Sequence, residues 1–225
     1  MIVAERKPIS KIVEMVAAYE KVLLVGCGTC VAVCLAGGEK EVQILAQELR
    51  LKARSDGRKQ TFDEVTLTRQ CDKEYLELIA TRVKDYDALL STACGAGVQF
   101  LAERYDSVRV LPALDTRFIG VALGAGEWQQ RCIACADCVL DQTGGICPKT
   151  MCAKGLVNGP CGGTNHGKCE VNPETDCAWT LIYNRLKKLD RLDLMRGVAP
   201  LKRFKPSVHP ARFHHMAYKR FDETD

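Results

Sequence analysis

The chain has 225 residues and a formal net charge of +4; 47% of its residues are hydrophobic and 27% are charged. This composition supports a buried core and excludes an intrinsically disordered chain. The first ten residues carry charges and no long apolar stretch, which argues against a signal peptide or a membrane span. Thirteen cysteines are the unusual feature. We therefore expect a cytoplasmic protein whose clustered thiols bind metal and do not form disulfides.

Alternating helices and strands are predicted over residues 1–125. Ser10 is expected to cap a first helix, and the apolar run 21–26 is typical of a buried parallel strand. The predicted elements that follow are a helix at 39–54, a strand at 61–67, a helix capped by Asp72, a strand at 87–92, a helix at 96–104 and a strand at 107–112. This alternation predicts an α/β domain with an open parallel sheet and flanking helices, whose strand order stays open.

Residues 126–190 are predicted to form a small, irregular, cysteine-rich domain. Glycine pairs and few apolar runs leave it without an adequate hydrophobic core, so metal ligation is expected to order it. A helical period returns after Cys177. It places one apolar stripe along a helix, made of Trp179, Ile182, Leu186 and Leu189.

Residues 191–225 are predicted to be an extended, basic docking tail. The last 41 residues, 185–225, hold eleven Lys and Arg against five Asp and Glu. Closely spaced prolines, Pro200, Pro206 and Pro210, disfavour a long helix there. The candidate anchors for a partner's groove are aromatic: Phe204, Phe213, Tyr218 and Phe221.

A first group of thiols follows the predicted strands. Cys27, Cys71 and Cys94 come after the first, second and third strands. Because the carboxyl ends of parallel strands lie side by side, these thiols should converge. We expect them to bind a [4Fe–4S] cluster with Cys30 as the fourth ligand and Cys34 as the reserve; the alternative is ordinary burial of small apolar side chains. The stretch GCGTCV (26–31) misses the dinucleotide-binding G-x-G-x-x-G pattern, since its third glycine is absent.

A second group of thiols begins with a C-x2-C-x2-C triple. Bacterial ferredoxins use such a triple for a cubane cluster, with a later Cys-Pro. The predicted cluster ligands here are Cys132, Cys135, Cys138 and Cys147. Four further thiols complete a metal site for zinc or a second cluster: Cys152, Cys161, Cys169 and Cys177. Spacing does not determine how these eight are shared, and two zinc sites without a redox role are the alternative.

Motifs for substrate chemistry are missing from the sequence. It contains no nucleophile elbow, phosphate loop or HExxH motif, which favours an electron-carrying subunit over a complete enzyme. The basic tail also suggests a nucleic-acid-binding zinc protein. The aromatic content of only 6% and the slightly acidic remainder of the chain argue against that class.

Several pieces of the cysteine-rich half are distinctive: TGGICP (143–148), CAKGLVNGPCGG (152–163), GKCEV (167–171) and DCAW (176–179). Over about 132–190 the chain closely resembles the cysteine-rich domain associated with methylenetetrahydrofolate reductase in anaerobic bacteria. In the N-terminal half, GCGTCVAVCLAGGEKEV is similar to the rest of the small subunit found in acetogens.

The resemblance implies a non-catalytic electron-transfer subunit of an oxidoreductase. Its partner would be a flavin-bearing barrel subunit that reduces methylene- to methyl-tetrahydrofolate in the methyl branch of acetyl-CoA synthesis. The cofactors expected in this chain are at least two [4Fe–4S] clusters; zinc is the alternative at one C-terminal site, because the family's cysteine-rich domain is described as zinc-binding. Flavin and folate belong to the partner, further electron-donor subunits are compatible with this role, and neither nucleic acid nor a membrane is an expected partner. The rival interpretation is a structural or assembly subunit with zinc–thiolate sites.

Overall fold

The computed structural model describes residues 1–197 and residue 211. The chain divides into two compact units, Met1–Ile133 and Ala134–Asp225, and each is described here by itself. The predicted basic tail, with its prolines and aromatic anchors beyond residue 197, lies outside the described residues. In the described part of the chain, no helix combines the length and the apolar character needed to cross a bilayer.

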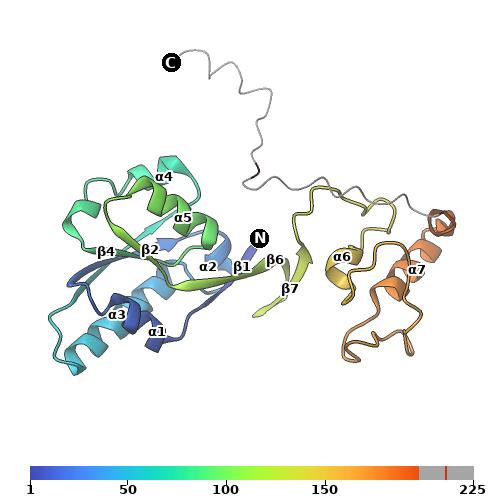
Figure 1. Cartoon of the computed structure of the whole chain (residues 1–225), viewed down its shortest axis with the longest axis horizontal. Helices are drawn as coiled ribbons and strands as arrows, with labels where there is room; N and C mark the ends of the chain where they lie inside the picture. The colour runs from blue at the N-terminus through green and yellow to red at the C-terminus, as the bar shows by residue number, and fades with distance from the viewer. Residues whose placement is uncertain (198–210, 212–225) are drawn as a thin grey trace, which may run out of the picture. The chain divides into compact units, whose positions relative to one another are not determined.

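The first unit is built on a four-stranded parallel sheet (Figure 1). Its strands are β2 (Lys21–Cys27), β3 (Thr61–Leu67), β4 (Ala88–Ser91) and β5 (Arg109–Pro112), in the order β3-β2-β4-β5. β2 is central, and every residue from Val22 to Cys27 is buried, as expected for a strand covered on both faces. The predicted α/β class with an open parallel sheet is confirmed.

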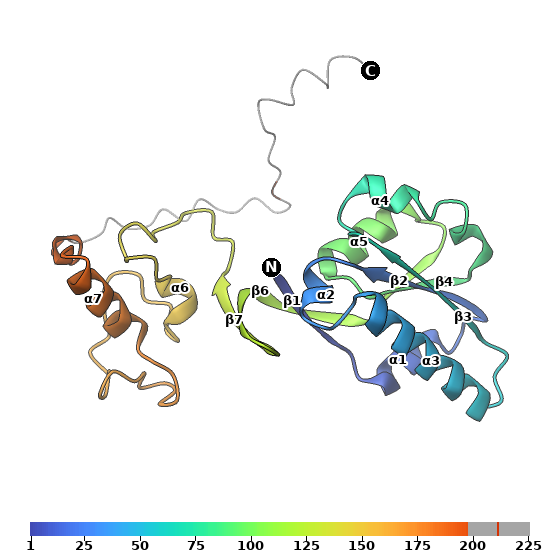
Figure 2. The same cartoon turned by 180° about the vertical axis from the view of Figure 1, so that it is seen from behind.

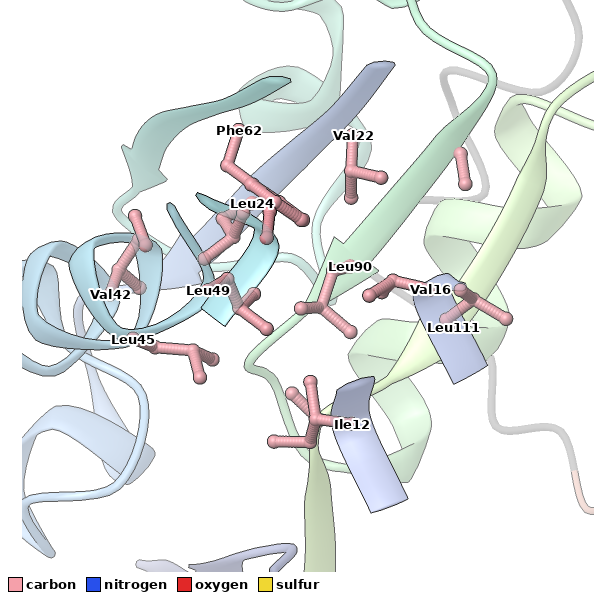
Figure 3. Packing of buried hydrophobic residues seen from close by; sticks show 14 residues of the cluster. Ile12, Val16, Val22, Leu24, Val42, Leu45, Leu49, Phe62, Leu90 and Leu111 are labelled. Carbon is pink, nitrogen blue, oxygen red and sulfur yellow. The ribbon is translucent and has the colours of Figure 1, made fainter. Parts of the chain in front are cut away.

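Helices cover both faces of this sheet (Figure 2). α1 (Ile9–Val16) and α3 (Glu39–Ser55) lie on one face, while α4 (Lys73–Glu77) and α5 (Gly95–Arg104) lie on the other. Successive side chains of a strand point to opposite faces. Leu24 therefore packs in the core under α1 and α3, which Figure 3 shows, whereas Leu23 packs in the core under α4 and α5.

Helix starts agree with the sequence analysis at one position and differ at another. The Asp72 carboxylate accepts a hydrogen bond from the Glu74 amide at 3.3 Å and caps α4, as predicted. The predicted cap at Ser10 is wrong, because α1 begins at Ile9 and its N-cap residue is Pro8. Pro8 has no amide hydrogen and a φ that suits a helix start, so the helix begins before the serine.

A second, antiparallel sheet was not predicted. It contains β1 (Ile2–Arg6), β6 (Leu114–Gly124) and β7 (Glu127–Cys132), in the order β1-β6-β7. Gly126, at φ +77°, lies in the β6–β7 turn, where a left-handed residue favours glycine. Since β1 pairs with β6, which is joined to β7, the first unit extends to Ile133 and not to the expected boundary at 125.

The described part of the second unit, residues 134–197, has little regular structure. It contains α6 (Pro148–Met151), α7 (Ala178–Lys188) and the 3-10 helix η2 (Leu192–Met195). Its buried hydrophobic cluster is small, consisting of Trp179, Ile182 and Leu186. Leu189 was predicted in the same stripe, but it follows the helix end and is 53% exposed.

Candidate metal centres

Three thiols from separate strand ends come together at the carboxyl edge of the parallel sheet. Cys27 ends β2, and Cys71 and Cys94 follow β3 and β4, the two strands that are hydrogen-bonded to β2. The pKa of the Cys71 thiol is raised, first by partial desolvation of its sulfur, although the residue as a whole is exposed, and then by the charges of Cys27 and Cys94. Such a charge effect requires the groups to be close in space. We call Cys27, Cys71 and Cys94 the sheet-edge thiols.

The two further cysteines of the first group differ in their surroundings. Cys30 is the first residue of α2 (Cys30–Val33) and is partly exposed. Cys34 is buried, and its sulfur lies 3.5 Å from both the amide nitrogen and the carbonyl oxygen of Ala4 in β1. A thiol satisfied by backbone groups in an apolar cluster acts as a packing side chain. Cys30 is therefore the better fourth candidate beside the sheet-edge thiols.

Backbone contacts hold the loops that carry these thiols. The Cys27 amide donates to the Gly37 carbonyl at 2.9 Å, and the Gly28 amide donates to the Leu67 carbonyl at 2.8 Å. A Cβ atom added at Gly37 would lie 1.9 Å from the Thr92 carbonyl oxygen. Glycine is thus required for the close approach of the β2 loop to the β4 loop.

The C-x2-C-x2-C triple spans the junction between the two units. Cys132 is the last residue of β7, while Cys135 and Cys138 belong to the second unit. Between the cysteines, Ala134 and Ala136 adopt positive φ angles of +52° and +57°. Residues other than glycine seldom adopt this conformation, and it is concentrated at functional sites.

Cys147 lies at the start of α6. It is the N-cap residue and precedes Pro148, which occupies the first turn of the helix. Proline favours this position because the first helical amides have no partner within the helix. Cys147 thus lies at a helix start, although α6 has four residues.

The remaining four predicted ligands surround one pocket. The pocket is lined by Cys152, Cys161, Cys169 and Cys177 together with Lys154, Thr164, Glu170, Ala178 and Trp179. We call this the four-thiol pocket. The structure thus brings together four cysteines that span 26 positions of sequence. His166, the nearby histidine, is not among the lining residues.

Short irregular contacts build the four-thiol pocket. The Cys169 amide donates to the Thr175 carbonyl at 3.0 Å, and the Cys177 amide donates to the Gly167 carbonyl at 2.7 Å. The Trp179 indole donates to the Leu156 carbonyl at 3.0 Å. These bonds tie the loop after Cys152 and the turn around residue 167 to the start of α7.

One ion pair lines the four-thiol pocket and was not anticipated from the sequence. Lys154 pairs with Glu170, whose carboxylate also accepts a hydrogen bond from the Cys161 thiol at 3.4 Å. The pKa of Lys154 is raised, first by its bond to Glu170 and then by the charges of Cys161 and Cys169. The available signal in the sequence was that Lys154 lies two residues after Cys152 and that Glu170 directly follows Cys169.

Glycine makes room for this carboxylate. A Cβ atom at Gly163 would lie 1.8 Å from an oxygen of Glu170, so any larger residue would displace the side chain. The Gly163 amide also points at the Cys161 sulfur, at 3.5 Å. Amide hydrogen bonds of this kind stabilise thiolates and tune metal–thiolate sites.

Cys177 has the clearest thiolate-stabilising surroundings. Its burial by itself would raise the pKa, but hydrogen bonds from the Thr180 hydroxyl and amide, the Trp179 amide and the Thr164 hydroxyl outweigh this and lower it. Cys177 is also the N-cap residue of the eleven-residue α7, where the helix dipole favours negative charge. The thiolate is the form of cysteine that binds metals.

The donor sets suit thiophilic metals. Four cysteine sulfurs are the ligands of structural zinc and of iron–sulfur clusters. Among the described residues, however, no three His, Cys, Asp or Glu side chains already point together as a metal shell. At the four-thiol pocket this agrees with Cys161, whose thiol is turned toward Glu170. Loading would require thiol reorientation within loops that are already in place.

Comparison with known proteins bears on the second half of the chain. Residues 111–205 match the family model described as "Methylene-tetrahydrofolate reductase C terminal". The matched segment begins in β5 and includes β6, β7 and the described cysteine-rich unit. No curated protein and no solved structure matches the chain. The match covers less than half of the 225 residues. The similarity over that segment supports a protein related to methylenetetrahydrofolate reductase and to one-carbon metabolism.

Proposed function

We propose that this chain is the electron-transfer subunit of a methylenetetrahydrofolate reductase complex. It would relay electrons to the flavin of a partner subunit that reduces methylene- to methyl-tetrahydrofolate. The observation that carries the proposal is the placement of Cys27, Cys71 and Cys94 at one sheet edge, in a chain whose residues 111–205, beyond these thiols, match the reductase family model. A cysteine kept only for packing has no reason to recur at three neighbouring strand ends.

The surroundings of the sheet-edge thiols suit electron exchange. Cys27 is 7% exposed, while Cys71 lies at the surface. Ligands that reach from the interior to the surface hold a centre partly away from water but within reach of a partner. A [4Fe–4S] cluster bound there, with Cys30 as the fourth ligand, would supply one-electron transfer.

The second group of cysteines would hold further metal. We assign a [4Fe–4S] cluster to Cys132, Cys135, Cys138 and Cys147, and zinc or a second such cluster to the four-thiol pocket. Lys154 beside Cys161 and Cys169 offsets part of the negative charge of a four-thiolate site. The lowered pKa of Cys177 favours ligation there at neutral pH.

A structural or assembly subunit with zinc–thiolate sites is the second candidate. The observation in its favour is the four-thiol pocket, which lies in a unit whose described residues form a small buried apolar cluster around Trp179, Ile182 and Leu186. Structural zinc commonly replaces a hydrophobic core in such small units. In that case the metal would stabilise the subunit and carry no electrons.

Metal analysis after anaerobic purification separates the two candidates. Electron transfer predicts iron and acid-labile sulfide at about eight of each per chain for two cubanes. Addition of the reduced full-length chain to the flavin subunit should then bleach the flavin absorbance. Zinc without iron, in a protein that leaves the flavin oxidised, would support the structural role instead.

A further inference from the structure

We propose that Gln70 is the positioning residue of the sheet-edge thiols. It is not expected to touch a metal. It would hold the three loops at the spacing that the metal requires, and so determine whether the site assembles. This inference rests on the proposed metal site at the sheet edge.

The side chain of Gln70 is fully buried and uses both ends of its amide. The amide nitrogen donates to the carbonyl oxygens of Val25 at 2.7 Å and of Gly26 at 3.1 Å. The amide oxygen accepts a hydrogen bond from the Ser91 hydroxyl at 2.6 Å. One side chain therefore joins the ends of β2 and β4 from a position just after β3.

Every segment joined in this way leads directly to a thiol. Gly26 precedes Cys27, and Gln70 itself precedes Cys71. The Ser91 hydroxyl accepts a further bond from the Ala93 amide at 3.2 Å, and Ala93 precedes Cys94. The network thus includes the residue before each of the three sheet-edge thiols. Loss of the Gln70 hydrogen bonds would therefore change the backbone positions of all three thiols.

Close packing holds the glutamine in place. A Cβ atom added at Gly97 in α5 would lie 3.0 Å from the Cβ atom of Gln70 and 2.8 Å from that of Ala93. Gln70 bonds to Val25, a residue of the apolar core under α4 and α5, and Ser91 and Thr92 are further buried polar side chains at this end of the sheet. An amide in an apolar core is costly unless its bonds are made, and when they are made it specifies one arrangement of its neighbours. Packing alone would have been served by leucine or methionine.

A matched pair of variants separates positioning from stability. Gln70→Met keeps the length of the side chain and removes its hydrogen bonds. Gln60→Met does the same at a glutamine that donates to the carbonyls of Val16 at 2.8 Å and Tyr19 at 2.7 Å, just before β3 begins. Gln60 lies at the opposite end of β3 from Gln70. The Gln60→Met variant therefore shows the effect of losing two similar side-chain-to-backbone hydrogen bonds far from the thiols.

The measurement is protection of each cysteine from iodoacetamide, mapped by mass spectrometry. The full chain is reconstituted with ferrous iron and sulfide without oxygen and compared with the metal-free chain. In the wild-type chain Cys27, Cys71 and Cys94 should be protected on loading. In Gln70→Met their labelling in the loaded sample should rise about tenfold or more, as for loss of an outer-shell partner. In Gln60→Met it should not change, and Cys135 should stay protected in both variants.

The outcomes are distinguishable. Protection of the sheet-edge thiols in Gln70→Met equal to that in Gln60→Met would overturn the positioning role. A wild-type chain whose sheet-edge thiols are never protected would overturn the metal site, and with it the role of Gln70. If Gln70→Met does not fold, as judged by circular dichroism, Ser91→Ala replaces it, because it removes only the hydrogen bonds of the Ser91 hydroxyl. This variant should raise the labelling of Cys71 and Cys94. Unchanged labelling of both cysteines would count against the proposal.

Discussion

The two units support their cysteines in different ways. The sheet-edge thiols lie on loops that extend from a parallel sheet with a hydrophobic core on each face. The four-thiol pocket lies among loops that pack against Trp179, Ile182 and Leu186. The first support exists without metal, because buried apolar area alone can stabilise it. The described part of the second unit buries a much smaller apolar cluster, so we expect its order to depend more strongly on ligation.

The two sites also differ in electrostatics. Burial and neighbouring thiols raise the pKa of Cys71, whereas hydrogen-bond donors lower the pKa of Cys177. Cys71 is therefore harder to deprotonate than an ordinary cysteine, and Cys177 is easier to deprotonate.

Among the predicted effects, removal of metal should produce the largest difference between the two units. A chelator strong enough to strip iron and zinc should lower amide protection across residues 134–197 by more than in the first unit, because metal ligation adds to the small apolar cluster there. Residues 21–27 of β2 should stay protected in the same sample. Hydrogen exchange measured by mass spectrometry on the full chain provides the test. Full protection of the second unit after complete metal removal would contradict the proposed dependence.

Replacement of one proposed ligand should remove one centre. Cys135→Ser, purified without oxygen, should lose about four irons per chain, as expected when a cubane loses a ligand. Cys34→Ala is the control, since the Cys34 sulfur contacts the β1 backbone, and its iron content should be unchanged. Iron and zinc analysis checks both variants, and a fall in zinc with constant iron would make the triple a zinc site.

A cavity in the first unit should destabilise it whether or not metal is bound. Leu24 is fully buried in β2 (Figure 3), so Leu24→Ala should cost about 3 kcal/mol of unfolding free energy from lost burial and a residual cavity. Leu51→Ala, at a position 65% exposed on α3, should change it by less than about 0.5 kcal/mol. Urea unfolding followed by circular dichroism measures both. If both variants lost the same unfolding free energy, the buried core around β2 would not be what stabilises the first unit.

The pH dependence of thiol labelling should separate the two sites. The thiolate is the reactive form, so the lowered pKa of Cys177 moves its labelling to lower pH, and the raised pKa of Cys71 moves its labelling to higher pH. In the metal-free chain, iodoacetamide rates measured residue by residue should give a lower midpoint for Cys177 than for Cys71. The reverse order would show that the donors around Cys177 do not stabilise its thiolate.

Helix capping should give the smallest effect. Asp72→Ala removes the bond to the Glu74 amide and should cost about 1 kcal/mol of unfolding free energy. Asp72→Asn should retain most of that energy, because asparagine also caps helices. The small remaining loss would come from the ion pair with Arg69, which asparagine does not form. Ser10→Ala should have little effect, since Ser10 lies inside α1. Thermal unfolding of the three variants checks this ranking, and a cost at Ser10 as large as that at Asp72 would contradict it.

The sequence by itself determined the parallel strands and the helices between them. A strand that is covered on both faces is apolar along its whole length, as β2 is, and a helix that covers a sheet is apolar on one face, as α3 is. Both patterns can be read from a short stretch of sequence. The same reasoning placed Cys27, Cys71 and Cys94 after parallel strands, whose carboxyl edges align, while the order that makes these strands neighbours came from the structure. In the cysteine-rich half, the spacing of the thiols and the scarcity of apolar runs together indicated an irregular unit.

Only the tertiary structure decided the features that join distant segments. β1 pairs with β6 across more than 100 residues, and neither strand has the alternating apolar pattern that would predict it. Cys34 was separated from the other thiols by its contacts with Ala4, and Gln70 gained its place from Val25, Gly26 and Ser91. Lys154 and Glu170 meet at the four-thiol pocket through loops. Side-chain contacts between loops leave no period in a sequence, since they depend on where the backbone of each loop is held by the rest of the fold.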